Sequence, residues 1–172
     1  MMSAHPALPP PSVLAVRTAL AGALVAIADL TWAVLWVREA HGASARRVLQ
    51  AVASGVLGSA AFQGGWLVAL LGLLVHTAVA FGWTLLFLGA LVRWPTLHAR
   101  VRGQRGARAV GLLYGALVWL LMDGLVLPLS RARATPPTAA WFWLQLLTHP
   151  FLVGLPIVWV LASPAATDGP RR

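Results

Sequence analysis

The chain has 172 residues, of which 59% are hydrophobic and only 10% are charged. A soluble domain carries about 25% charged residues, so this chain lacks the polar residues that would cover a surface exposed to water. Its net charge of +9 would also suit a nucleic-acid-binding protein. However, all 13 basic residues are arginines, and most of them lie in the short gaps between apolar segments and not along one face, as is typical beside membrane spans. The sequence therefore predicts an all-α, polytopic membrane protein with the lipid bilayer, and no nucleic acid, as its partner.

The chain begins with residues 1–12, where four prolines predict a disordered, polyproline-type tail. Four apolar segments follow, each long enough to cross a bilayer as a helix: about 14–37, 66–92, 109–129 and 141–162. The first has an alternative interpretation as a signal peptide cleaved before Asp29, because Arg17 and an apolar run precede the small residues there. Residues 163–172 are expected to form a second disordered tail.

A shorter helix is predicted over residues 46–62, between the first two spans. Its apolar residues recur at helical spacing, but it is rich in Ala, Ser and Gly and too short to cross the membrane. Such a helix either lies on the membrane surface or enters the membrane as a re-entrant piece.

The arginines also predict an orientation. With four spans, both termini and the connection between spans two and three share one side, which holds eight arginines against five on the other. Because positively charged connections stay in the cytoplasm, we expect both termini to be cytoplasmic.

Small residues and prolines mark the last two spans. Gly111 and Gly115 have the spacing that lets two helix backbones approach closely, either in a dimer or within one bundle. Pro150 and Pro156 each remove a backbone donor, so we expect kinks in the fourth span.

Each span also holds one Asp or His. These are Asp29, His76, Asp123 and His149. A rise of about 1.5 Å per residue places all four about 9 to 15 Å below the same membrane surface. Because an ionised side chain in the hydrocarbon costs at least about 2.5 kcal/mol, we expect all four to face the bundle interior. Gln145 would add hydrogen bonds, and Arg46 would join if the 46–62 helix folds back.

A cluster of Asp and His side chains at one depth in the membrane has several interpretations. The leading one is a small integral membrane protein whose Asp and His residues are structural or support ion or proton handling, with no cofactor and no catalytic residue. An alternative is a redox subunit in which His76 and His149 bind b-type haem or a divalent metal, for which two His and two Asp are suitable ligands. A third is an assembly or scaffold protein with a membrane-protein partner or a second copy of itself.

Several segments together resemble a known group of proteins. They are RVLQAVASGVLGSAAFQGG at 47–65, His76, Gly111–Gly115, VLPLS at 126–130, His149, and Gly154-Leu-Pro156. The pattern, which covers most of residues 17–162, resembles small bacterial integral membrane proteins with four spans and, more loosely, the YagU-like inner-membrane proteins. The resemblance implies a location in the bacterial cytoplasmic membrane. It brings no ligand and no reaction.

Overall fold

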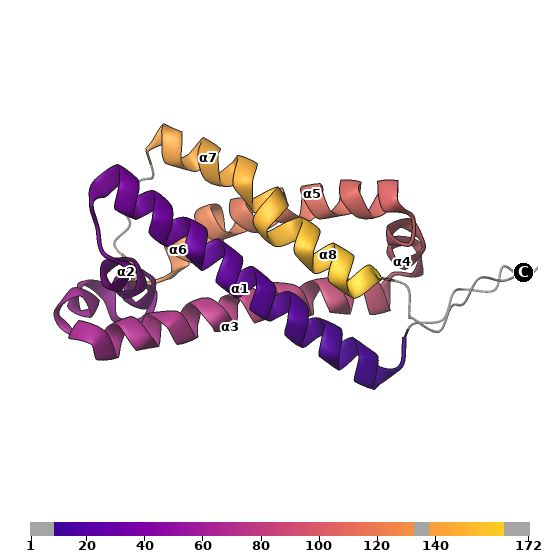
Figure 1. Cartoon of the computed structure of the whole chain (residues 1–172), viewed down its shortest axis with the longest axis horizontal. Coiled ribbons are helices and arrows are strands. Elements are labelled where there is room, and N and C mark those ends of the chain that lie inside the picture. Colours follow the sequence, from indigo (N-terminus) through magenta and orange to yellow (C-terminus); the bar gives the residue numbers. More distant parts are fainter. Residues whose placement is uncertain (1–8, 133–137, 164–172) are drawn as a thin grey trace, which may run out of the picture.

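The structure is a computed structural model that describes residues 9–132 and 138–163. Within these ranges the chain is all-α, with four long apolar helices and two short ones (Figure 1). The long helices are α1 (Pro11–His41), α3 (Gly65–Arg93), Gln104–Leu129 and Ala139–Ala162, and each is long and apolar enough to cross a membrane. The predicted fold class, four spans with an additional short helix, is confirmed.

Helix α1 is longer than the predicted span. It begins at Pro11, so the last two residues of the expected tail are helical. A proline fits there because the first N–H groups of a helix have no partner within it. The helix continues without a break past Asp29 and ends where Gly42 adopts a left-handed conformation and donates its N–H to Arg38 O. The remainder of both expected tails, residues 1–8 and 164–172, lies outside the described residues.

Two short helices close the two ends of the bundle. Helix α2 (Ala45–Leu57) and the 3-10 turn η1 (Gly58–Gln63) take the place of the predicted 46–62 segment, and the Ser44 side chain caps α2 by accepting from Arg47 N–H. Helix α2 packs so closely on α3 that a Cβ on Gly72 would overlap Leu49 O. At the opposite end, α4 (Pro95–Val101) forms in a connection for which the sequence predicted no helix (Figure 1).

The last two spans each contain one wide, π-helical turn. The third span consists of α5 (Gln104–Leu121), η2 (Met122–Val126) and α6 (Leu127–Leu129). The fourth consists of α7 (Ala139–His149), η3 (Pro150–Gly154) and α8 (Leu155–Ala162). In each, the residue that follows the wide turn donates its N–H five residues back and precedes a proline, Pro128 or Pro156. Because proline cannot donate the regular i to i−4 bond, it favours the wide turn at both places.

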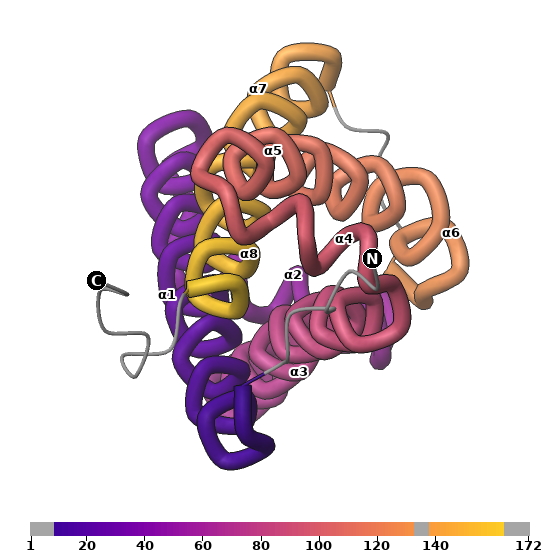
Figure 2. The backbone as a smooth tube through the Cα atoms, turned by 90° about the vertical axis from the view of Figure 1, so that its right-hand side faces the viewer, coloured from indigo at the N-terminus to yellow at the C-terminus, as the bar shows by residue number. Residues whose placement is uncertain are grey.

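Helix α8 lies between α1 and α5, as the view along the bundle shows (Figure 2). The turn η3, which leads into α8, contacts α5 through glycines. A Cβ on Gly115 would lie 2.5 Å from His149 O, and a Cβ on Gly154 would overlap Gly111 O. The Gly111 and Gly115 face therefore serves packing inside the bundle, which is one of the two uses that the spacing predicted.

Large apolar side chains on several spans point away from the bundle. Leu67 is 79% exposed, Leu113 71% and Leu147 66%. The core itself is narrow and is built from residues such as Phe87, Val118 and Ile157. An apolar surface of this extent suits lipid and not water. The chain is a small polytopic membrane protein.

The glycine contact gives a first prediction. Gly115→Ala is expected to lower the free energy of unfolding by about 1–3 kcal/mol, because the added methyl group forces α5 away from η3. The matched control is Gly82→Ala in α3, where a Cβ would have no atom within 4 Å. Thermal unfolding in detergent, followed by the fluorescence of the nine tryptophans, measures both. Equal stability of the two variants would contradict the close contact.

Candidate functional site

A cavity of about 140 Å³ lies between the spans, beside the start of η3. It is lined by polar side chains from α1, α3 and α7, namely Asp29, His76, Gln145 and His149, and by Trp119 of α5. Pockets that hold small organic ligands measure about 300–1,000 Å³, whereas one water molecule needs only about 10–15 Å³ by this measure. The cavity therefore suits several water molecules.

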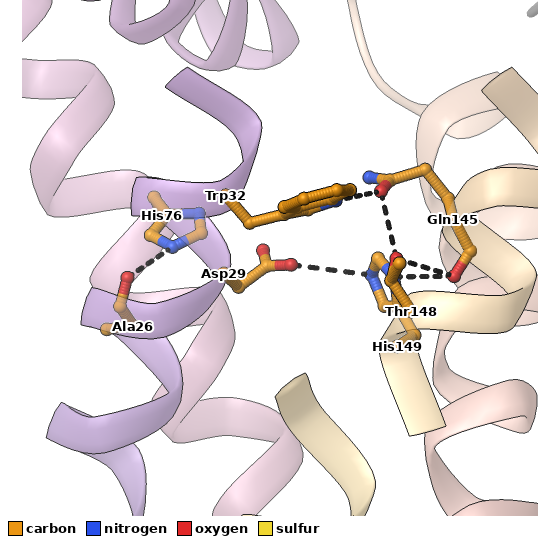
Figure 3. A network of polar contacts seen from close by, with 7 residues as sticks. All are labelled: Ala26, Asp29, Trp32, His76, Gln145, Thr148 and His149. Carbon is orange, nitrogen blue, oxygen red and sulfur yellow. Dashed lines mark hydrogen bonds and ion pairs between the residues drawn. The ribbon is translucent and has the colours of Figure 1, made fainter. Parts of the chain in front are cut away.

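Asp29 and His149 face each other in this cavity (Figure 3). Asp29 Oδ1 lies 3.8 Å from His149 Nε2. This distance is too long for a direct hydrogen bond, and among the described residues Asp29 Oδ1 has no hydrogen-bond partner although it is buried. A water molecule beside the pair, at hydrogen-bond distance from each of the two atoms, could bond to both. The two groups thus form a facing acid–base pair.

The other ring nitrogen of His149 determines which atom can exchange a proton. His149 Nδ1 lies 3.0 Å from Gln145 O, and a carbonyl oxygen only accepts, so Nδ1 carries a hydrogen. The proton that the ring gains or loses is therefore on Nε2, the atom that faces Asp29. The ring is held in place by Trp119, whose centroid is 4.9 Å away. The pair can hold one shared proton, either on the carboxyl group or on the imidazole.

Gln145 is hydrogen-bonded across the bundle. Its Oε1 accepts from Trp32 Nε1 at 3.0 Å and from Thr148 Oγ1 at 3.3 Å (Figure 3). The bond from Trp32 ties α1 to α7 directly above the Asp29–His149 pair. The sequence placed Trp32 only near the end of a span. Its position three residues after Asp29, on the same helical face, was the signal that could have assigned it to the site.

His76 lines the same cavity but bonds elsewhere. Its Nε2 lies 3.0 Å from Ala26 O, so this nitrogen donates to a carbonyl of α1. No hydrogen bond or ion pair joins His76 to Asp29 in the part of the chain that the structure describes. The structure thus gathers Asp29, His76, Gln145 and His149 around one cavity, with Asp29 and His149 as its facing pair.

Two of the predicted site residues do not line the cavity. Asp123 lies in η2 and is only partly buried, while its neighbour Met122 takes the cavity position. In a regular helix Met122, seven residues after Gly115, stays close to the face that Gly115 and Trp119 share. Successive steps of four residues drift by about 40° each and carry Asp123 away from that face. Arg46 is exposed on α2, with its guanidinium 5.9 Å from the centre of the Trp66 ring, and does not fold back into the bundle.

The arrangement does not fit the haem or metal that His76 and His149 suggested. The cavity is smaller than the pockets that hold organic ligands, so it does not have room for a haem between His76 and His149. Within residues 9–132 and 138–163, no three His, Asp or Glu side chains converge as metal ligands would.

Comparisons of the chain with protein-family models, curated proteins and solved structures found no match. The identification of a four-span membrane protein rests on the four long apolar helices themselves.

The Gln145 network gives a second prediction. Gln145→Leu is expected to lower the free energy of unfolding by about 1–3 kcal/mol, because Trp32 Nε1 loses its acceptor inside the bundle. Thr148→Val removes a donor but leaves the bond from Trp32 intact, so we expect a smaller loss. Thermal unfolding in detergent compares them. An equal loss in both variants would mean that the Trp32 bond contributes nothing.

Proposed function

We propose that the Asp29–His149 pair exchanges a proton within the membrane and that this small membrane protein supports proton or ion handling. The observation that carries the proposal is the geometry of the pair. A carboxylate oxygen and the titrating nitrogen of an imidazole lie 3.8 Å apart. They share a cavity with room for several water molecules.

The energetics of the membrane interior favour a shared proton. An isolated charge at this depth is costly, so either residue alone would tend to remain neutral. The pair has the same net charge in both of its states. In one state a neutral acid faces a neutral imidazole, and in the other a carboxylate faces an imidazolium. A proton can therefore move between the two residues without a change in the net charge of the site.

The backbone beside His149 adds polar groups. Pro150 has no N–H to donate to Leu146 O, and Pro156 has none for Leu152 O. A carbonyl that lacks its regular i+4 donor beside a titratable group is typical of the broken helices that carry ions in membrane proteins.

A structural role for the same residues is the second candidate. The bonds from Trp32 to Gln145 and from His76 to Ala26 connect neighbouring helices and favour it. A purely structural cluster predicts that its removal lowers stability and changes no transport.

We further propose that the membrane is a bacterial cytoplasmic membrane and that both termini face the cytoplasm. Two features support the proposal: the excess of arginines on the side of the termini and the resemblance to small bacterial four-span proteins. The start of α1, helix α4 and the end of α8 lie at the same end of the bundle (Figure 1), which agrees with this threading.

Proton flux into liposomes tests the pair. The purified chain is reconstituted with a pH-sensitive dye inside the vesicles, and a membrane potential is imposed. Asp29→Asn and His149→Gln are each expected to reduce flux to that of empty liposomes, because the shared proton loses its donor or its acceptor. Asp123→Asn, the matched loss of an acid outside the cavity, is expected to retain the flux of the wild type.

Two results would contradict proton exchange. One is wild-type flux no faster than that of empty liposomes. The other is unchanged flux in Asp29→Asn and His149→Gln. Thermal unfolding of the same preparations supports the structural role if these variants lose stability without losing flux.

Cysteine labelling tests the orientation. The natural chain has no cysteine, so each introduced cysteine is the only reactive thiol. Gly103→Cys changes no charge, and a Cβ there has no atom within 4 Å. We expect an impermeant maleimide to label exposed His41→Cys in intact spheroplasts and to label Gly103→Cys only after permeabilisation. The reverse pattern would invert the proposed orientation.

A further inference from the structure

A second, larger pocket lies at the end of the bundle that holds α4 and the end of α8. Its volume is about 310 Å³. One wall is formed by Arg102, Gln104 and Arg108, and the opposite wall by Trp159 and Ser163. The pocket lies where two spans meet the membrane surface, because α5 begins at Gln104 and α8 ends at Ala162.

This end of the bundle is positively charged, and no acidic residue in the described part of the chain lies there to balance the charge. Its arginines include Arg93, Arg100, Arg102, Arg105 and Arg108. The described acids lie elsewhere, two in the second half of α1 and one in η2. A pocket in such a region attracts anions.

The two arginines of the pocket have donors to offer. Arg108 Nη2 donates to Gln104 Oε1 at 3.3 Å, which leaves its other donors for a ligand. The guanidinium of Arg102 has no hydrogen bond or ion pair with any other described residue. Its charge acts on a neighbour instead: the pKa of His98 is lowered, first by burial and then by the positive charge of Arg102.

Backbone groups and α8 complete the pocket. Gly103, the residue before α5, has no side chain that could cap the helix, so the first N–H groups beside Gln104 add partial positive charge. The guanidinium of Arg17 donates to the carbonyls of Leu161 and Ser163, which holds the end of α8 against α1. The opposite wall therefore has a fixed position.

We propose that this pocket binds a phosphoryl group, with Arg102 and Arg108 as its ligands. A guanidinium matches phosphate oxygens with two parallel hydrogen bonds, and a pair of arginines around one pocket is a typical phosphate site. The group comes either from the headgroup of an anionic phospholipid or from a free phosphate. The position at the membrane surface and the half-exposed indole of Trp159 favour the lipid.

Lipid binding to the full-length protein in detergent tests the proposal. Phosphatidylglycerol, phosphatidylcholine or inorganic phosphate is added separately, and binding is measured by native mass spectrometry and by the midpoint of thermal unfolding. We expect phosphatidylglycerol to bind and to raise the midpoint, and phosphatidylcholine to do neither. Arg102→Gln and Arg108→Gln are each expected to weaken the binding of phosphatidylglycerol about fivefold.

The matched control is Arg105→Gln. It removes the same charge from the same basic connection, but Arg105 does not line the pocket, so we expect binding like that of the wild type. Stabilisation by millimolar inorganic phosphate that is lost in Arg102→Gln and Arg108→Gln would identify free phosphate as the source of the phosphoryl group. Equal weakening in all three variants would overturn the proposal, because surface charge alone would then explain binding. Equal binding of phosphatidylglycerol and phosphatidylcholine would also overturn it, because the acyl chains alone would then explain binding.

Discussion

The close approach of α5 to the η3 turn is the contact on which the polar interior depends. At Gly115 and Gly154 the two backbones touch without intervening side chains. That approach brings His149, the last residue before η3, against the Trp119 ring of α5. His149 then faces Asp29 of α1. A larger residue at either glycine would separate the helices, and His149 would then move away from Trp119. The glycines therefore determine the geometry of a site to which they contribute no polar atom.

The second constraint comes from the surrounding lipid, which offers no hydrogen bonds. Polar side chains of the spans accordingly bond to carbonyls within the bundle: Thr84 to Ala80 O, His76 to Ala26 O, and Tyr114 to Trp83 O. Among the described residues, two buried side-chain atoms have no hydrogen-bond partner, Asp29 Oδ1 and Trp119 Nε1. Both residues line the cavity that also holds His149. The polar groups left over are thus collected at one place, where water molecules can satisfy them.

Hydropathy was sufficient to predict the four spans, because the bilayer demands one long apolar helix for each crossing. It was also sufficient to predict that buried acids and imidazoles turn inward, and Asp29, His76 and His149 do so. The prediction for Asp123 followed steps of four residues from Gly115, and because each step drifts by about 40°, Asp123 leaves the face that Met122 keeps. The wide turn at η2 was not predicted, although its cause, Pro128, lies only five residues beyond Asp123. Pro128 was visible in the sequence, but a proline alone does not specify whether a helix kinks, ends or widens.

Helix α8 connects the two candidate sites and also keeps them separate. Its start follows the wide turn beside His149, and its end carries Trp159, a wall of the basic pocket. At the start, glycine packing against α5 fixes its position. At the end, Arg17 fixes it by bonds to two terminal carbonyls. Because the two attachments use different residues, a change at Asp29 or His149 leaves the wall of the basic pocket in place. The loss of one function would then be assignable to one site.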